Sequence, residues 1–311
     1  MPIGIIRNVV IPKLKDCRVI SVTLTGGEPF VHPEIIEIVR LLRNANIRVG
    51  VCTNGTSVSQ DQMETLAKIG NIHLNVSLDG FRPESHGKFR GDKTSFVKTI
   101  KTIRQLKQYR LLQGLLVTPN NLAEISEYAE LCEFAVQNDA IYVLMNPLSS
   151  MGKEVKAQKR LKAPDEVMRQ IREITSPFSD CIQVIYIRFP NDQKLPLISC
   201  ETGNIIYVFT HGELTVCPYL VFAAKTPQSL YNPGGFIVGN IFKEADVADK
   251  LDAYKFHERY YLGDNPTCKN CSLSFQCGKG CPAAIIASRQ RIEGLDPIYP
   301  MANFPGGDKD G

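Results

Sequence analysis

The fold is indicated most clearly by Val19-Ile-Ser-Val-Thr-Leu-Thr-Gly-Gly-Glu-Pro29, in which a short apolar strand runs into two glycines and a carboxylate. Paired glycines let a backbone approach a ligand closely because they carry no Cβ. Ligands bind at the carboxyl ends of parallel strands in α/β proteins. We therefore expect Gly26, Gly27 and Glu28 to line a binding site, with Pro29 stiffening the turn.

Short apolar runs alternate with amphipathic patterns through the first half of the chain. Strand-like runs occupy residues 19–24, 48–52, 72–78, 112–117 and 140–145, and helical patterns occupy residues 33–44, 61–69, 95–108 and 122–136. Strand–helix alternation with short connections predicts a parallel α/β sheet that is closed or partly closed. Residues 3–16 are typical of the end of a helix, so the pattern begins in the middle of a strand–helix unit.

Composition excludes several classes of protein. The 311 residues carry 36 Lys and Arg against 32 Asp and Glu, and the resulting net charge of +4 is too small to argue for a nucleic-acid partner. No apolar run reaches the ~18–20 residues that span a bilayer, so we expect no membrane association. The first residues lack the basic and apolar regions of a secretory signal, and we expect a cytoplasmic protein.

The pattern of the chain changes after about residue 150. A chain of this length suggests two domains at about 150 residues each. Residues 164–174 are typical of a helix and residues 182–189 of a strand, and from Cys200 onward short β-like runs alternate with turns and cysteines. We therefore expect a first domain over residues 1–165, a bridging segment over 166–199 and a cysteine-rich domain over 200–311.

Two further strand ends are polar. Cys52-Thr-Asn54-Gly55 ends one strand, and Ser77-Leu-Asp79-Gly80 ends the next. Asn-Gly or Asp-Gly alone is typical of a tight turn. Because three such ends meet at one edge of a parallel sheet, we expect them to build a cofactor pocket together.

From residue 19 to about residue 153 the chain resembles the radical S-adenosylmethionine (SAM) superfamily. Gly26-Gly27-Glu28-Pro29 is similar to the family motif that binds the methionine amino group of SAM, and Thr53-Asn54-Gly55 is similar to the signature at the next strand end. Ser77-Leu78-Asp79-Gly80 resembles the strand end that contacts the carboxylate or ribose of SAM.

A fourth segment extends the resemblance. His86 and Arg90 match the His-x-x-x-Arg-Gly segment of the family, which implies that Arg90 pairs with the SAM carboxylate. A guanidinium fork matches the two oxygens of a carboxylate, although a solvated arginine is the alternative. The cofactor-binding residues that the resemblance implies are Gly26, Gly27, Glu28, Pro29, Asn54, Ser77, Asp79 and Arg90.

One family feature is missing from the sequence. Radical SAM enzymes hold a [4Fe–4S] cluster with a Cys-x3-Cys-x2-Cys motif after the first barrel strand, and residues 1–199 contain no such motif. We therefore expect a partial (β/α)6 barrel that lacks its first strand. The chain is then either an N-terminally truncated copy of an enzyme or a protein that keeps only a binding role, and no catalytic residue can be named. The scattered cysteines are expected to be small buried hydrophobic residues, and they are Cys17, Cys52, Cys132 and Cys181.

Six cysteines gather in the last third of the chain in two patterns, Cys200-x11-Gly212-x4-Cys217 and Cys268-x2-Cys271-x5-Cys277-x3-Cys281. Crowding of this kind in a reducing compartment indicates metal or cluster ligation. Thiolates two residues apart ligate one centre in many iron–sulfur and zinc sites. The spacing leaves iron–sulfur clusters, zinc and free thiols as alternatives.

The late cysteines resemble the SPASM domain, which carries auxiliary [4Fe–4S] clusters in radical SAM enzymes that modify peptides and proteins. The resemblance implies two ligand groups, one of Cys200, Cys217 and Cys281 and the other of Cys268, Cys271 and Cys277. Tyr299 stands where the family has a seventh cysteine. A phenol is a poor ligand beside soft thiolates, so the second cluster needs a substitute such as Asp296, or keeps an open iron, or is labile.

The resemblance implies a radical SAM/SPASM iron–sulfur protein, with reductive SAM cleavage and radical modification of a peptide or protein as the family chemistry. The implied cofactors are SAM and up to two auxiliary [4Fe–4S] clusters. A small electron-donor protein such as flavodoxin or ferredoxin is the expected partner, and a tetrapyrrole is an alternative substrate. Two other interpretations stay open, namely a non-catalytic cluster-containing peptide-binding protein and a zinc-stabilised α/β protein.

Overall fold

The computed structural model describes residues 1–149, 151 and 160–300. The chain divides into two compact units. The first comprises Met1–Leu148 and Ala157–Phe189, and the second comprises Ser149–Lys156 and Pro190–Gly311. The end of the stretch that resembles radical SAM proteins, near residue 153, lies outside the described residues.

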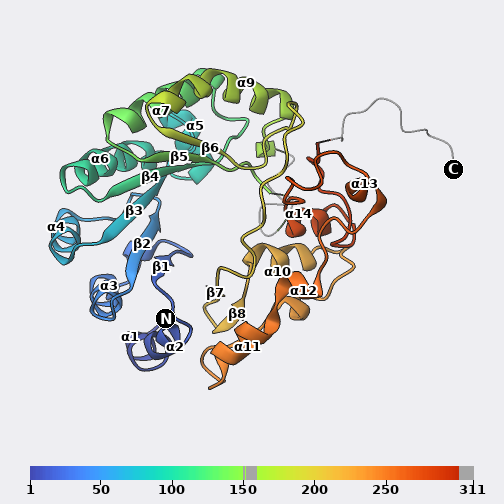
Figure 1. The fold of residues 1–311 in the computed structure, drawn as a ribbon. Helices are drawn as coiled ribbons and strands as arrows, with labels where there is room; N and C mark the ends of the chain where they lie inside the picture. Colours follow the sequence, from blue (N-terminus) through green and yellow to red (C-terminus); the bar gives the residue numbers. More distant parts are fainter. Residues whose placement is uncertain (150, 152–159, 301–311) are drawn as a thin grey trace. The chain divides into compact units, whose positions relative to one another are not determined.

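The first unit is built on one sheet of six parallel strands (Figure 1). The strands pair in chain order and are β1 (Ser21–Leu24), β2 (Arg48–Thr53), β3 (Ile72–Ser77), β4 (Leu112–Val117), β5 (Tyr142–Met145) and β6 (Gln183–Tyr186). The first five coincide with the strand-like runs of the sequence, which confirms the predicted parallel α/β sheet.

The sixth strand extends the α/β unit further along the chain than the sequence indicated. β6 lies within the stretch 166–199 that we expected to bridge two domains, and it pairs with β5 with Tyr142 opposite Gln183. Residues up to Phe189 belong to the first unit, and residues from Pro190 onward belong to the second.

Helices lie along one face of this sheet (Figure 1). They are α3 (Ile35–Asn44), α4 (Gln60–Ile69), α6 (Ser95–Gln108), α7 (Ile125–Gln137) and α9 (Asp165–Thr175), while α5 (Pro83–Arg90) follows β3 and short turns form η2 (Pro29–Val31) and η4 (Ser176–Asp180). Val49 and Val51 of β2 are fully buried, whereas Gly50 and Cys52 beside them are only partly covered. The sheet therefore has a face packed on helices and a second face, called the open face below.

The chain begins with a helical segment, as the sequence predicted. It consists of α1 (Ile3–Ile5), η1 (Ile6–Val10) and α2 (Ile11–Asp16), and its middle turns are π-helical. Pro12 has no N–H to donate to the preceding turn, which accounts for the irregular helix there. No helix in the described part of the chain is long and apolar enough to cross a membrane.

The second unit contains a small antiparallel sheet and short helices. The sheet is made of β7 (Tyr207–Val208), β8 (Glu213–Thr215) and β9 (Gly239–Asn240). The helices are α10 (Pro218–Ala224), η5 (Pro233–Phe236), α11 (Val247–Tyr254), α12 (Phe256–Arg259), α13 (Pro266–Lys269) and α14 (Pro282–Ala287).

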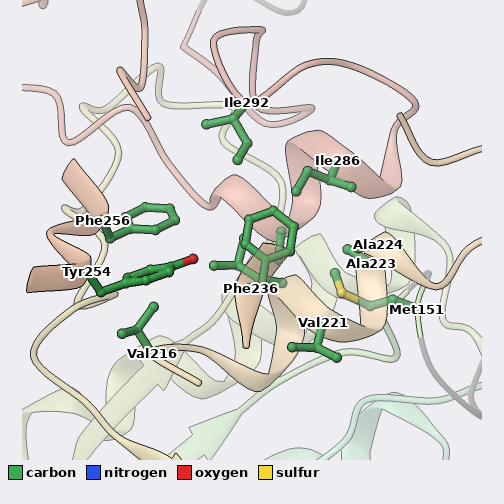
Figure 2. Packing of buried hydrophobic residues seen from close by; sticks show 12 residues of the cluster. Met151, Val216, Val221, Ala223, Ala224, Phe236, Tyr254, Phe256, Ile286 and Ile292 are labelled. Carbon is green, nitrogen blue, oxygen red and sulfur yellow. The ribbon is translucent and has the colours of Figure 1, made fainter. Parts of the chain in front are cut away.

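A single hydrophobic cluster holds these short elements together. Phe236 is fully buried at its centre, with Ala223 of α10 and Ile286 of α14 nearby (Figure 2). Burying apolar area stabilises a fold by about 25 cal/mol per Å², so this cluster is the main source of stability for a unit with so little regular structure. Cys217 and Cys281 pack against its edge.

The four scattered cysteines differ in exposure. Cys132 in α7 is fully buried, which confirms the prediction, and burial raises the pKa of its thiol to about 12. Cys17 and Cys52 are partly exposed, so the prediction that they are buried is confirmed only in part. Cys181 is exposed, and the prediction for it is wrong because it follows the 3-10 turn η4 outside the sheet.

Candidate functional site

Glu28 is fixed at the carboxyl end of the sheet by three hydrogen bonds. Its Oε1 accepts from the Thr53 hydroxyl at 2.7 Å and from the Phe30 N–H at 3.1 Å. Its Oε2 accepts from the Asn54 N–H at 2.7 Å. The carboxylate thus bridges the ends of β1 and β2. A carboxylate oxygen has two lone pairs, so Oε2 keeps capacity to accept from an ammonium group.

The two glycines before Glu28 leave open space at this edge. A Cβ on Gly26 or Gly27 would have no atom within 4 Å, and both residues are exposed. Gly26 has φ of 129°, a region that side-chain-bearing residues rarely adopt. An unobstructed backbone beside a fixed carboxylate is the arrangement that a small cationic ligand would need.

The end of β2 is anchored from the helical face. Asn54 accepts a hydrogen bond from the Thr99 hydroxyl through its backbone oxygen at 2.8 Å, and its side-chain Oδ1 accepts from the N–H and hydroxyl of Thr56. A Cβ on Gly55 would lie 3.0 Å from Val76 and 3.3 Å from Thr99. These contacts hold the turn in place. The predicted residue Asn54 lies next to Glu28, because its backbone N–H donates to the Glu28 carboxylate.

Asp79 is completely buried at the end of β3, and protein groups engage its polar atoms. Its Oδ1 accepts from the Thr118 N–H at 2.9 Å, and its Oδ2 accepts from Arg90 Nε at 2.5 Å. Its backbone oxygen accepts from Asn120 Nδ2 at 2.7 Å. Its carboxylate thus holds Arg90, and a contact between Asp79 and the cofactor stays a prediction.

Arg90 closes helix α5 and reaches back to the strand end. Its Nε donates to Asp79, while 31 % of its side chain is exposed. No described residue hydrogen bonds to the two terminal nitrogens of the guanidinium, so its fork can meet a second carboxylate. Sequence reasoning named Arg90 but not the ion pair that positions it.

His86 supports the same strand end from α5. Its Nδ1 accepts from the Asp79 N–H at 3.1 Å, and the side chain is 1 % exposed. The pKa of His86 is lowered from 6.5 to about 4, mainly by burial; the charge of Asp79 opposes this shift and the positive charge of Arg90 adds to it. The ring is therefore neutral at pH 7 and carries its proton on Nε2, which is buried without a hydrogen-bond partner among the described residues.

The end of β4 contributes residues that we did not single out from the sequence. Asn120 is fully buried, and its N–H donates to the Tyr128 hydroxyl at 2.9 Å. Together with Thr118 it ties the β4 loop to Asp79. The rule that polar strand ends form sites applies equally to Thr118-Pro119-Asn120, so this signal was present in the sequence.

The open face of the sheet is polar near the same edge. Cys52 lies opposite Asn75 in the pairing of β2 and β3, and Ser77 lies two residues further along β3 on the same side. Asn75 Oδ1 accepts from the Tyr142 hydroxyl at 2.7 Å, and burial raises the pKa of the Cys52 thiol. Ser77 is thus placed on the open face, and no described residue hydrogen bonds to its hydroxyl.

In the second unit, three of the six late cysteines line one hollow. Cys268, Cys271 and Cys277 line one shallow hollow, which is also lined by Leu197, Thr267, Lys279, Asp296, Tyr299 and Pro300. Asn265 accepts from the Cys268 N–H at 2.9 Å and so fixes the first thiol at the start of α13. Cys277 Sγ accepts from the Lys279 N–H at 3.4 Å.

Of the other three cysteines, two lie directly before the helices α10 and α14, and the third, Cys200, lies beside Thr202. Cys217 immediately precedes α10 and Cys281 immediately precedes α14. Cys200 Sγ lies 2.8 Å from the Thr202 hydroxyl, which also hydrogen bonds to Cys217. Burial raises the pKa of Cys217, and backbone N–H groups at the start of α10 oppose that rise.

Backbone pairing brings the early and late cysteine segments together. Ser199 pairs with Lys279 as an antiparallel bridge, and the Gly278 N–H donates to the Leu197 oxygen at 2.7 Å. Gly278 lies so close to Ser199 that no side chain would fit there. This pairing places Cys200 near Cys277 in space.

The donor sets can be compared with single metal ions. Among the described residues, no three His, Cys, Asp or Glu side chains converge so as to hold one metal ion. Zinc needs four ligands at about 2.0–2.3 Å from one point. Cys268, Cys271 and Cys277 are the side chains of this hollow that would hold an inorganic centre.

Comparisons with known proteins agree with the first unit. Residues 8–132 match the profile of the radical SAM superfamily. The antilisterial bacteriocin subtilosin biosynthesis protein AlbA of Bacillus subtilis is 28 % identical over 236 residues, which is 75 % of this chain and 49 % of AlbA. The AdoMet-dependent heme synthase of Methanosarcina barkeri is 36 % identical over 112 residues, 35 % of this chain and 32 % of that protein. The chain thus spans less than half the length of these two relatives.

A solved structure shares the fold. The crystal structure of Streptococcus suis SuiB bound to S-adenosylmethionine superimposes with a TM-score of 0.69 over 95 % of this chain and 69 % of SuiB, at 17 % identity. Sequence motifs, the parallel sheet and the profile match all lead to one assignment. Residues 8–132 of this chain are a radical SAM domain.

Proposed function

We propose that this protein binds SAM at the carboxyl ends of β1–β3 and auxiliary iron–sulfur clusters at its late cysteines, and that it acts on a peptide or protein. The observation that carries the proposal is the Glu28 carboxylate, which is fixed by Thr53 and Asn54 beside two unobstructed glycines. In the radical SAM superfamily the corresponding motif receives the methionine ammonium.

Two charges of this chain suit the two ends of the amino-acid moiety of SAM. The free acceptor capacity of Glu28 suits its ammonium group. The terminal nitrogens of Arg90 suit its carboxylate, because the Asp79 pair uses only Nε. Ser77 and Asn54 are proposed to complete the pocket, and Pro29 is proposed to stiffen the turn that presents Glu28.

The second unit is proposed to be a SPASM-type domain. One cluster would be held by Cys268, Cys271 and Cys277 in the hollow, and the other by Cys200, Cys217 and Cys281. Two observations support this grouping. Cys268, Cys271 and Cys277 line one hollow, and the Thr202 hydroxyl hydrogen bonds to both Cys200 and Cys217. All ten cysteines are free thiols, which suits a reducing, cytoplasmic location.

A peptide is the substrate class that the comparisons favour. The match to AlbA, a bacteriocin biosynthesis protein, covers 75 % of this chain, whereas the match to the heme synthase covers 35 %. We therefore propose a peptide or protein substrate over a tetrapyrrole. A small electron-donor protein such as flavodoxin or ferredoxin is proposed as the source of electrons for the clusters.

The steps proposed for this chain are those that its own residues can perform. When bound to a reduced cluster, SAM supplies the radical chemistry of the superfamily. That catalytic cluster needs a Cys-x3-Cys-x2-Cys motif, which residues 1–199 do not contain. Binding and orienting SAM, holding auxiliary clusters and binding a peptide are the roles assigned here, and a cluster-containing binding protein would perform the same three.

SAM binding by the anaerobically purified chain tests the proposal. Isothermal titration should show saturable binding that weakens at least tenfold in Glu28→Gln, because the neutral amide loses the negative charge that attracts an ammonium and turns its NH2 group toward the N–H of either Phe30 or Asn54. The matched control is Glu37→Gln, a carboxylate in an exposed ion pair with Arg40. Equal affinity in Glu28→Gln and the wild type would remove Glu28 from the site.

A further inference from the structure

Tyr142 of β5 lies across the open face of the sheet and reaches β3. Its hydroxyl donates to Asn75 Oδ1 at 2.7 Å. Between the two strands stands Gly114 of β4, where an added Cβ would lie 2.6 to 2.7 Å from three atoms of the Tyr142 ring. The strand pairings place Asn75 opposite Gly114 and Gly114 opposite Tyr142. Gly114 therefore makes room for the ring, because any side chain there would occupy its position.

Asn75 connects this ring to Cys52 of β2. Cys52 lies opposite Asn75 in the pairing of β2 and β3. Burial raises the pKa of the Cys52 thiol, and a hydrogen bond from the Asn75 side chain opposes that rise. Since such a bond must be donated to sulfur, the Asn75 NH2 group faces Cys52 while its oxygen faces Tyr142. Cys52, Asn75 and Tyr142 form a connected set across β2–β5, called the polar row below.

Nearer the carboxyl ends of β4–β6, the open face is apolar. Leu116 lies opposite Ser77 and Leu144, and Leu144 lies opposite Ile185. The three apolar side chains are partly exposed, whereas Val143, on the helix-packed face, is fully buried. Two residues along a strand advance by about 6.6–6.8 Å. A ligand that enters from the strand ends therefore passes these apolar groups before it meets the polar row.

The polar row offers hydrogen-bond acceptors without charge. The single proton of the Tyr142 hydroxyl goes to Asn75, so toward a ligand its oxygen can only accept. Asn75 Oδ1 keeps a second lone pair. The residues of the two rows are all uncharged at pH 7, and they are Cys52, Asn75, Gly114 and Tyr142 in one and Ser77, Leu116, Leu144 and Ile185 in the other. A charged ligand group would lose its water here without gaining an ion partner from these rows.

We infer that Tyr142 and Asn75 determine which side chain of a peptide the open face accepts. They select a long neutral side chain that ends in a hydrogen-bond donor, such as a primary amide, over a carboxylate, an ammonium or an aliphatic end. The aliphatic stem of such a side chain would contact Leu116 and Leu144, and its N–H would donate to the Tyr142 oxygen. The inference rests on the proposed function, which supplies the peptide as the ligand.

The test titrates the full chain, purified anaerobically, with N-acetyl methylamides of glutamine, glutamate, lysine and norleucine. Dissociation constants come from nuclear magnetic resonance, with and without saturating SAM. Glutamine and glutamate have side chains of nearly equal shape, so their comparison isolates charge. We expect the glutamine probe to bind at least tenfold more tightly than the glutamate probe, and severalfold more tightly than the norleucine probe. Equal affinities for glutamine and glutamate would overturn the inference, and so would failure of all four probes to bind.

Two phenol variants locate the selectivity. Tyr142→Phe keeps a ring over Gly114 and removes the acceptor, so the glutamine probe should lose its advantage over the norleucine probe. The matched control is Tyr109→Phe, which removes a hydroxyl that donates to Glu64 of α4 at 3.1 Å, and it should keep the wild-type preference. A glutamine preference that persists in Tyr142→Phe overturns the inference.

A charge variant gives the opposite selectivity. Asn75→Asp adds a negative charge to the polar row and keeps an oxygen that accepts from Tyr142, so the lysine probe should bind at least tenfold more tightly than it binds the wild type. An unchanged lysine affinity would contradict the assignment. Isothermal titration of the wild type with SAM tests the proposed function separately. Selective probe binding without SAM binding would remove the SAM site and leave this inference standing, whereas SAM binding without probe selectivity would overturn the inference alone.

Discussion

Replacing Asp79 by Asn tests how the strand ends position a ligand-binding arginine. Asp79 is fully buried, and Arg90 is 31 % exposed. The neutral amide loses the charge-assisted hydrogen bond to Arg90 Nε, and its NH2 group faces a donor of either Arg90 or Thr118. Breaking a fully buried ion pair costs about 3–5 kcal/mol, and partial exposure of Arg90 lowers our expectation to about 2–4 kcal/mol.

Two measurements follow this change. Urea unfolding, followed by circular dichroism, should show that loss in the free energy of unfolding of the first unit. Isothermal titration should show SAM affinity lowered about tenfold, which corresponds to about 1.4 kcal/mol, because Arg90 is no longer fixed. Asp92→Asn is the control, since Asp92 is exposed and its bonds to Thr94 can be made by an amide, so its effect should stay below about 1 kcal/mol.

A double-mutant cycle separates positioning from direct contact. If Asp79 acts on SAM only through Arg90, then Asp79→Asn should not weaken SAM binding further in an Arg90→Gln background. The reasoning is refuted if Asp79→Asn lowers SAM affinity by the same factor in both backgrounds. That result would mean that the Asp79 carboxylate touches the cofactor itself.

Three other changes have defined outcomes. Gly27→Ala should weaken SAM binding severalfold yet change thermal stability by less than about 0.5 kcal/mol, because the added methyl meets no protein atom within 4 Å, and a large drop in melting temperature would contradict this. Gly114→Ala should cost about 1–3 kcal/mol in thermal unfolding, because its Cβ would lie 2.6 Å from the Tyr142 ring, and a neutral effect would show that the ring can move. The pKa of His86 is lowered from 6.5 to about 4, so the unfolded chain binds a proton in that interval that the folded chain does not. The unfolding free energy should therefore be complete above about pH 6.5 and fall by up to about 1.4 kcal/mol per pH unit as the pH drops toward 4. His86→Gln should remove this dependence from urea midpoints, and an unchanged pH profile would count against it.

Much of the first unit could be predicted from sequence because its signals are local. Apolar runs located five strands, and helix α6 was predicted at its observed bounds. The strand β6 was also expected, within residues 182–189, but its place in the sheet was not, because a long polar stretch separates it from β5 in place of the short spacing of the other units. Only its pairing with β5 in three dimensions assigns it to the sheet.

The location of the candidate site could be predicted from the sequence, whereas the hydrogen bonds and ion pair within it could not. Glu28 and Arg90 were identified from motifs, but the Asp79–Arg90 pair depends on how helix α5 turns Arg90 back toward the strand end. The hydrogen bond from the Asp79 N–H to His86 likewise depends on the ring orientation in a buried helix. No pattern of residue types specifies such directions.

The cysteines show a similar division. The resemblance to the SPASM domain implied two groups of thiols, and the three thiols of one group line the hollow. Spacing did not reveal that the Asp296 carboxylate is occupied by the N–H groups of Cys281 and Ile298. That contact depends on how the chain folds back from Asp296 toward Cys281.

The central claim is that SAM binds at the carboxyl ends of β1–β3. A crystal structure of the anaerobically prepared chain with SAM tests it most directly. We predict electron density for the methionine ammonium at Glu28 and for its carboxylate at the terminal nitrogens of Arg90. Density for SAM at any other place in the chain, or none beside Gly26 and Gly27 at saturating SAM, would contradict the account.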